Sequence, residues 1–343
     1  MNKWVTFTLH GEGANAIQKV NADVREVAMQ MGYKPLYIFR YDGSNESDEA
    51  LNARIDGITA AVKPGDIILY LYPVLNGFHF DKTFIGNLKA RGCRFAISIL
   101  DSEQLRYPKE LFSYEQVGKE YTLFNQAEAL IVHGQAMADK LKELGNTSMM
   151  IQRGPFDYLM SDTEAQLTNH LQKKLTFVGS FDKSPFISTW NYQTELSVFG
   201  SLYYGNSKET FPISPKVEFL GIDNFLQRIP RDRFGIFWDE GFNYQVYSRY
   251  TSPHKVALYL SLGIPLIVWE ESATAVLVNK YGLGFTITSL DEIDTLLQNT
   301  SDEALVELKK RVNEFSYFIR EGSFTRRAIR ELEQGLFNGF WAG

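Results

Sequence analysis

The stretch YTSPHKVALYLSLGIPLIV, residues 250–268, contains a marked helix start, a short apolar helix, a Gly-Ile-Pro stop and an apolar strand. Ser252 is a good N-cap, and Pro253 suits the first helical position. A helix over 254–262 that leads directly into a strand over 265–269 is typical of an α/β unit. We therefore expect this stretch to add one strand and one covering helix to a parallel sheet.

Apolar runs alternate with amphipathic segments along the first half of the chain. This alternation favours a parallel sheet with helices on both faces, so the first half is predicted to be Rossmann-like. The predicted strands cover residues 4–9, 35–40, 67–72, 94–100 and 129–132, and the predicted helices cover 14–31, 48–62, 84–91, 114–126 and 135–144.

A second α/β series follows the polar stretch 161–174, which has the composition of a linker. Because 343 residues exceed the usual size of a single core, two domains are expected. We predict an N-terminal Rossmann-like domain over 1–158, a second α/β domain over 159–320, and a C-terminal segment over 321–343. The second series has predicted strands at 175–178, 217–220, 234–238, 265–269 and 285–287, and predicted helices at 254–262, 273–280, 291–298 and 302–315.

The last amphipathic segment, residues 325–336, carries apolar residues at Ala328, Ile329 and Leu332. This spacing is typical of a helix with one buried face. We expect the helix to cross back to the first domain, where that face finds a partner surface.

The composition excludes several classes of protein. With 35 basic and 41 acidic side chains the net charge is −6, which argues against a general nucleic-acid-binding field. One cysteine and five scattered histidines offer no zinc-site spacing, so no metal site is predicted. No signal peptide or membrane span is evident, and a soluble, cytoplasmic protein is expected.

Two basic clusters stand out in this acidic chain, at residues 231–233 and 326–327. They are compatible with peripheral association with the inner face of the membrane or with a phosphate. Solvated helix faces are the alternative explanation.

Lys255 falls in the first turn of the helix over 254–262, where a cation opposes the helix dipole by roughly 0.3–1 kcal/mol. A bound anion would reverse this penalty. The free backbone N–H groups, the Ser252 hydroxyl and the Lys255 ammonium together form a candidate diphosphate site. An exposed lysine at an ordinary helix start is the alternative.

The order Ser-Pro-x-Lys, a short apolar helix, Gly-Ile-Pro-Leu-Ile-Val and then Tyr281-Gly282-Leu283-Gly284 resembles the donor-binding half of GT-B glycosyltransferases. More specifically, the chain resembles the glucosyltransferases that extend O-linked N-acetylglucosamine on bacterial serine-rich adhesins, and related galactofuranosyltransferases. Further matching features are Asp56-Gly57-Ile58 before Gly65-Asp66-Ile67-Ile68, Phe234-Gly235 with Trp238, and the ending at residues 322–327.

This resemblance implies a metal-independent hexosyltransferase with a UDP-sugar donor, no cofactor, a glycoprotein or glycolipid acceptor, and a homo-oligomer, dimer or tetramer. It also implies two Rossmann-like domains that face an interdomain cleft, with the acceptor side on the N-terminal domain over 1–158 and a nucleotide-sugar-binding C-terminal domain over 159–320. Trp238 can equally belong to the core, and glycine after a strand is commonly a turn residue. The donor-binding candidates are Gly179, Ser180, Phe219, Gly221, Trp238, Tyr250, Ser252, Pro253, His254 and Lys255.

The loop His10-Gly11-Glu12-Gly13-Ala14-Asn15 lies at a strand-to-helix junction, where acceptor and donor sugar would meet. Its glycines permit close approach of a ligand to the backbone. Gly11, Gly13 and Asn15 are the acceptor-side candidates. The loop is not a dinucleotide fingerprint, since Ala16 stands where a third glycine is needed.

An inverting transferase requires a carboxylate or imidazole that activates the acceptor hydroxyl. Asp101, directly after the strand over 94–100, is the first candidate, and Glu12 and His10 follow. Asp101 can equally cap the next helix. The family often has His-Asp here, whereas this chain has Leu100-Asp101, which affects both the role of Asp101 and the choice of acceptor.

Three functions are compatible with these features. The first is hexose transfer from a UDP-sugar to a GlcNAc-modified serine-rich adhesin or a lipid-linked polysaccharide intermediate. The second is a catalytically silent GT-B partner or chaperone of another transferase, and the third is a nucleotide-sugar epimerase of the same fold.

Overall fold

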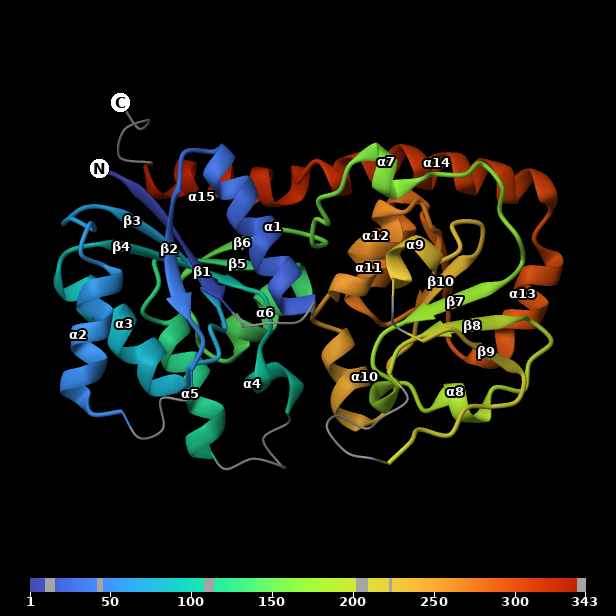
Figure 1. Cartoon of the computed structure of the whole chain (residues 1–343), viewed down its shortest axis with the longest axis horizontal. Coiled ribbons are helices and arrows are strands. Elements are labelled where there is room, and N and C mark those ends of the chain that lie inside the picture. Colours follow the sequence, from blue (N-terminus) through green and yellow to red (C-terminus); the bar gives the residue numbers. More distant parts are fainter. Residues whose placement is uncertain (10–15, 42–45, 108–113, 202–208, 222–223, 338–343) are drawn as a thin grey trace. The chain divides into compact units, whose positions relative to one another are not determined.

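The computed structural model describes residues 1–9, 16–41, 46–107, 114–201, 209–221 and 224–337 of the chain. These residues form two compact units (Figure 1). The N-terminal unit comprises residues 1–154 together with 322–343, and the C-terminal unit comprises residues 155–321.

The N-terminal unit is built on a six-stranded parallel sheet in the order β2-β1-β3-β4-β5-β6. Every residue of β3 is buried, as expected for an apolar run covered on both faces. The strands are β1 Lys3–Leu9, β2 Lys34–Phe39, β3 Ile67–Tyr72, β4 Arg94–Ile99, β5 Ala129–Val132 and β6 Met149–Gln152; the helices are α1 Ala16–Gln30, α2 Asp48–Ile58, α3 Phe78–Ala90, α4 Glu103–Arg106, α5 Tyr114–Phe124, α6 Gln135–Glu143 and α15 Ser323–Leu336.

The C-terminal unit contains a second six-stranded parallel sheet, in the order β12-β11-β10-β7-β8-β9. Its strands are β7 Leu175–Val178, β8 Leu196–Phe199, β9 Val217–Phe219, β10 Phe234–Phe237, β11 Leu266–Trp269 and β12 Gly284–Ile287. Its helices are α7 Asp162–Ala165, α8 Phe186–Thr189, α9 Phe225–Arg228, α10 Phe242–Ser248, α11 His254–Ser261, α12 Ala273–Tyr281, α13 Ile293–Asn299 and α14 Asp302–Arg320, with 3₁₀ turns η1 Phe181–Lys183 and η2 Leu290–Glu292.

Each sheet contains one point where the strand order reverses. In the N-terminal unit the chain places β2 on one side of β1 and then β3 on the other. In the C-terminal unit it places β8 and β9 on one side of β7 and then returns to β10 on the other. Open α/β sheets bind ligands beyond the carboxyl ends of the strands at such a switch point. The topology therefore directs attention to the segments that follow β1 and β3, and β7 and β10.

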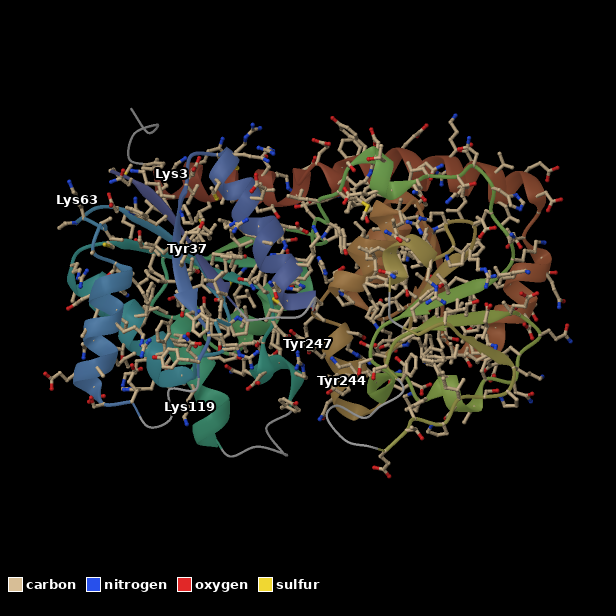
Figure 2. All side chains as sticks on the ribbon, in the orientation of Figure 1. Lys3, Tyr37, Lys63, Lys119, Tyr244 and Tyr247 are labelled. Atoms are coloured by element: carbon tan, nitrogen blue, oxygen red, sulfur yellow. The ribbon has the colours of Figure 1, made fainter. Side chains whose placement is uncertain are left out.

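The last helix, α15, belongs to the N-terminal unit, as the amphipathic pattern predicts. It packs against α1, β5 and β6 (Figure 1) and buries Ala328, Ile329 and Leu332. Lys3 on β1, labelled in Figure 2, donates to Glu333 of this helix at 2.7 Å. The helix is thus part of the core of the N-terminal unit.

The basic pair at residues 326–327 contributes to the same attachment. Arg326 donates to the side chain of Gln30 at 2.7 Å, and Arg327 donates to the backbone oxygens of Gln152 and Arg153 at 3.0 and 2.8 Å. The two arginines therefore bind neighbouring elements of their own unit.

The sequence-based assignment omits two strands, β6 and β8, and begins α3 six residues too late, at residue 84. In β8 the apolar run is interrupted by Ser197, which is buried because its hydroxyl donates to Glu218 at 2.5 Å. The first turn of α3 follows Gly77, whose φ of +89° suits glycine. The predicted start of α3 thus misses a local turn at Gly77, whereas the serine in β8 is accommodated by a tertiary hydrogen bond.

No helix in the described part of the chain is long and apolar enough to cross a membrane.

Leu332 provides a test of the attachment of α15. The side chain is fully buried, so Leu332→Ala is expected to destabilise the N-terminal unit by about 2–5 kcal/mol through loss of contacts and creation of a cavity. Urea unfolding measures the effect. Arg330→Ala on the exposed face of the same helix serves as the control and should change stability by no more than about 0.5 kcal/mol. Equal stability of the two variants would contradict the packing.

Candidate functional site

Helix α11 begins at His254, as predicted for a helix over 254–262. Pro253, with φ −72° and ψ 158°, is the N-cap rather than the first helical residue. Ser252 is therefore not the N-cap; its buried hydroxyl accepts a hydrogen bond from Thr274 at 3.4 Å. The N-cap thus lies one residue later than predicted, because the extended ψ of Pro253 keeps this residue outside the helix. Pro253 makes no side-chain cap bond to the first N–H groups of α11.

Lys255 lies in the first turn of α11, at the switch point of the C-terminal sheet. Its ammonium forms an ion pair with Asp239 at 3.1 Å. It also lies over the rings of Phe177 on β7 and Phe237 on β10, at 4.7 and 5.2 Å from their centroids. With only 16% of the side chain exposed, the cation is held at the carboxyl ends of the two strands between which the order reverses.

A single glycine determines how closely α11 approaches the sheet. A Cβ atom on Gly235 of β10 would lie 2.6–2.9 Å from ring atoms of Tyr259, so this residue has room for hydrogen alone. The Tyr259 hydroxyl accepts a hydrogen bond from the backbone N–H of Val178 at 2.7 Å. Burial raises the pKa of Tyr259 well above its ordinary value, so the hydroxyl stays protonated. These contacts fix α11, and with it Lys255, against β7 and β10.

The other end of α11 is fixed by buried cations. Lys309 on α14 is fully buried and donates to the backbone oxygens of Gly263 and Arg231. Burial lowers the pKa of Lys309 to about 8. Arg231 is also buried and donates to the backbone oxygens of Ala165 and Leu226. The expectation that the cluster at 231–233 forms a solvated face is therefore wrong for Arg231, which connects backbone segments.

Several predicted donor-binding residues lie around Lys255. Gly179 directly follows β7 with φ +151°, and a Cβ atom there would lie 3.6 Å from the Lys255 ammonium. Ser180 comes next in the chain, at the start of η1. His254 is buried and stacks on Tyr158, with centroids 4.8 Å apart. The structure thus brings Gly179, Ser180 and the residues 252–255 to one edge of the sheet.

The remaining donor-binding candidates are more dispersed. Phe219 ends β9 and Gly221 lies two residues later; β9 is two strands from β7, about 10 Å away. The ring of Phe219 nevertheless lies 6.2 Å from that of Phe181, the residue after Ser180. Trp238 follows β10, is buried and donates from Nε1 to Glu240 at 3.3 Å. Tyr250 is half-buried, and its backbone N–H donates to the backbone oxygen of Tyr247, near the end of α10, at 2.9 Å.

The N-terminal unit has a cavity of about 540 Å³ beyond the carboxyl ends of β3 and β4. Asp101, the first candidate for a catalytic base, lines it together with three further carboxylates, of which Asp81 and Glu120 are buried. Lys119 on α5, labelled in Figure 2, also lines it. The other lining residues are Ile17, Tyr72, Pro73, Leu75, Gly77, Phe78, Glu103, Gln104, Arg106 and Tyr107.

Both carboxylate oxygens of Asp101 are engaged. Oδ1 accepts a hydrogen bond from the backbone N–H of Ser102 at 3.0 Å, and Oδ2 forms an ion pair with Arg106. Asp101 thus lies next to the N-cap of α4, which is Ser102.

Glu120 is buried and holds the segment that carries Asp101. Its carboxylate accepts four hydrogen bonds: from the hydroxyls of Ser102 and Tyr72 at 2.6 and 3.1 Å, and from the backbone N–H groups of Glu103 and Gln104 at 2.9 and 3.0 Å. Burial raises the pKa of Glu120. Because both of its oxygens are saturated by protein donors, Glu120 serves as a fixed support for the cavity wall.

Asp81, on the first turn of α3, is 4% exposed. Its Oδ1 accepts a hydrogen bond from the Tyr70 hydroxyl at 2.6 Å. Burial, with a smaller contribution from the charge of Glu120, raises the pKa of Asp81 to about 7.

Sequence reasoning missed Asp81, Glu120 and Asp239, since none stands in a recognisable motif. The other predicted catalytic and acceptor-side residues, His10, Gly11, Glu12, Gly13 and Asn15, lie outside the described residues. Within the described ranges no group of three or more His, Cys, Asp or Glu side chains is placed to hold a metal ion.

Comparison with known proteins identifies the family. Residues 2–154 match the family domain described as "glucosyltransferase 3-like, N-terminal domain", and residues 175–332 match the corresponding C-terminal domain. Glucosyltransferase 3 of Streptococcus gordonii is 30% identical over 318 residues, which cover 90% of this chain and 91% of that protein. The chain belongs to the glucosyltransferase 3-like family. It is therefore a glycosyltransferase.

A further curated protein and a solved structure are also similar to this chain. The beta-1,6-galactofuranosyltransferase WbbI of Escherichia coli K12 is 22% identical over 283 residues, 79% of this chain and 80% of that protein. An alpha-glucosyltransferase solved with UDP and a 13-mer DNA has a TM-score of 0.59 at 14% identity, covering 97% of this chain and 98% of that one. The structural likeness confirms the GT-B fold predicted for this member of the glucosyltransferase 3-like family.

The contact between Gly235 and Tyr259 can be tested directly. Gly235→Ala is expected to destabilise the C-terminal unit by about 1–3 kcal/mol, because the new methyl group would collide with a ring that is itself fully buried. Thermal unfolding measures the loss.

Gly57→Ala is the matched control, since Gly57 is exposed on α2 and a Cβ atom there meets nothing within 4 Å. This change should preserve stability or raise it by about 0.5–1 kcal/mol. If Gly235→Ala proved as stable as Gly57→Ala, the close packing of Tyr259 on Gly235 would be incorrect.

Proposed function

We propose that this glycosyltransferase transfers a hexose of the glucose or galactofuranose type from a UDP-sugar to a glycan acceptor. A GlcNAc-modified serine-rich adhesin and a lipid-linked polysaccharide intermediate are the proposed acceptor classes. The observation that carries the proposal is the Lys255 ammonium, held beyond the carboxyl ends of β7 and β10 at the switch point of the sheet. The net charge of −6 argues against DNA as the acceptor, although the structural relative was solved with DNA.

The donor diphosphate would lie at the start of α11. The uncapped N–H groups of the first turn and the Lys255 ammonium supply the positive potential, and Gly179 lets a phosphate approach the backbone. Asp239 holds the ammonium in place before the donor binds. During transfer the bond between the anomeric carbon and the diphosphate oxygen breaks, and these groups stabilise the charge that collects on the departing UDP. No metal ion is required by this arrangement.

The acceptor would enter the cavity of the N-terminal unit. Asp101 lines this cavity and is the first of the three candidate bases that the sequence predicts. The other two, Glu12 and His10, lie outside the described residues. Glu120 holds the segment after β4 and so fixes the position of Asp101 relative to β3.

A silent partner of another transferase is the second candidate function. The observation that favours it is the engagement of both Asp101 oxygens, by Ser102 and Arg106, which leaves this carboxylate poorly prepared to accept a proton. A screen of UDP-sugars for hydrolysis and transfer separates the two, because a silent partner would bind UDP without turning any donor over.

Lys255→Ala tests the donor site. A charge-assisted bond to phosphate is worth about 1.5–3 kcal/mol, so UDP affinity should fall roughly 10- to 100-fold. Isothermal titration with UDP in the absence of added metal measures it. Lys280→Ala, on an exposed position of α12 in the same unit, is the matched control and should bind UDP as the wild type does. Unchanged binding by Lys255→Ala would remove the basis of the proposal.

A further inference from the structure

Four carboxylates line the N-terminal cavity. Glu103 is exposed, whereas Asp101 is half-buried and Asp81 and Glu120 are buried. Among the latter three, Asp81 differs from the other two in its hydrogen bonding. Glu120 accepts four hydrogen bonds on its two oxygens, and both oxygens of Asp101 are bound. Asp81 accepts one, from the Tyr70 hydroxyl to Oδ1. Within the described residues no hydrogen-bond donor is found for Asp81 Oδ2. Of the three, Asp81 is therefore the carboxylate with an oxygen left for a ligand in the cavity.

The position of Asp81 is rigid as well as buried. It lies on the first turn of α3, directly after the loop from β3. The Tyr70 hydroxyl, on β3, donates a buried hydrogen bond to the Asp81 carboxylate. The neighbouring rings of Phe80 and Phe84 stack at 5.7 Å, and Tyr70 lies 5.3 Å from Phe84. A carboxylate fixed in this way has lost most of its side-chain freedom before any ligand arrives.

The electrostatic setting disfavours a purely structural role. A neutral amide would make the same bond to Tyr70 without the cost of a buried charge. The charged and titratable groups that bond to Asp81 or line the cavity with it are Tyr70 and Tyr72 on β3, Lys119 and Glu120 on α5, and Asp101, Glu103, Arg106 and Tyr107 after β4. Burial and Glu120 raise the pKa of Asp81 to about 7, near the value at which a general base works best at neutral pH.

We propose that Asp81 is a catalytic residue, which binds the attacking hydroxyl of the acceptor through its carboxylate and takes up the proton of that hydroxyl during transfer. This inference rests on the proposed function. The acceptor oxygen forms a bond to the anomeric carbon while the bond to the diphosphate breaks and its electron pair leaves with UDP. The proton moves from the acceptor to Asp81, which later releases it to water. In this scheme Asp101, paired with Arg106, lies beside the acceptor but does not take up the proton of the acceptor hydroxyl.

The first test is Asp81→Asn, which preserves the bond from Tyr70 and removes the proton acceptor. Transfer from UDP-glucose to p-nitrophenyl N-acetylglucosaminide should fall by a factor of about 100 or more in kcat. The Kd for UDP should stay within twofold of the wild type, since the donor site belongs to the other unit. Asp139→Asn, at an exposed position of α6, is the matched control and should keep both values.

The second test is the pH dependence of transfer. In the wild type the rate should rise with pH through about 7 as Asp81 loses its proton. Tyr70→Phe removes the hydrogen bond that favours the charged form, so this rise should move to higher pH. If Asp81 had only a packing role, the midpoint of the pH–rate profile would be the same in Tyr70→Phe and in the wild type.

A stability measurement excludes misfolding as the cause of lost activity. Because the folded-state pKa of Asp81 lies above the unfolded value, the stability associated with its protonated form is complete below about pH 4 and is lost as the pH rises through about 7. Asp81→Asn should therefore have a Tm at least as high as the wild type at pH 8, and an equal one at pH 4.

The outcomes separate the two proposals. Normal transfer by Asp81→Asn, or a pH midpoint unmoved in Tyr70→Phe, overturns the role of Asp81 and leaves the proposed function standing. Failure of the wild type to bind UDP or to turn over any UDP-sugar overturns the proposed function, and the role of Asp81 with it.

Discussion

The C-terminal unit depends on the contact between the ring of Tyr259 and the bare Cα of Gly235. Any side chain on Gly235 would lift α11 from β10, and the bond from the Val178 N–H to the tyrosine hydroxyl would then be lost. The position of Lys255 follows from this contact, because the lysine lies one helical turn before Tyr259 on the same helix. A packing constraint in the core thus places a charge at the edge of the sheet.

In the N-terminal unit, buried carboxylates fix the positions of the residues that line the cavity. Glu120 spans the backbone of α4 and the hydroxyl of Tyr72, so the segment after β4 cannot move independently of β3. Tyr70 and Tyr72, on the same strand, each hold one carboxylate of the cavity. Two tyrosines at alternate positions of a fully buried strand thereby set the spacing of Asp81 and Glu120. Such sites are more precise when they rest on strands and helices than when they rest on loops alone.

The sequence predicts much of the fold and the family, but less of the site. The continuous apolar run of β3 and the alternation of elements suffice for two parallel sheets, and the spacing of Ile329 and Leu332 correctly predicts the return of α15. The N-cap of α11 is predicted one residue early, at Ser252, because Pro253 adopts an extended conformation that a local N-cap rule does not anticipate. The roles of Asp81 and Glu120 depend on partners 11 and 18 residues away on other elements. No short motif encodes such pairs, which only tertiary packing brings together.

The discontinuity of the N-terminal unit has a consequence for its biosynthesis. The segment of residues 1–154 leaves the ribosome first, but the groove that receives Ile329 and Leu332 stays unfilled until the whole of 155–321 has been made. Translation at about 5–20 residues per second makes this interval on the order of 10–30 s. The C-terminal unit, contiguous in the chain, can complete its core before the N-terminal unit does, and a nascent chain halted before α15 would expose an apolar face on β5, β6 and α1.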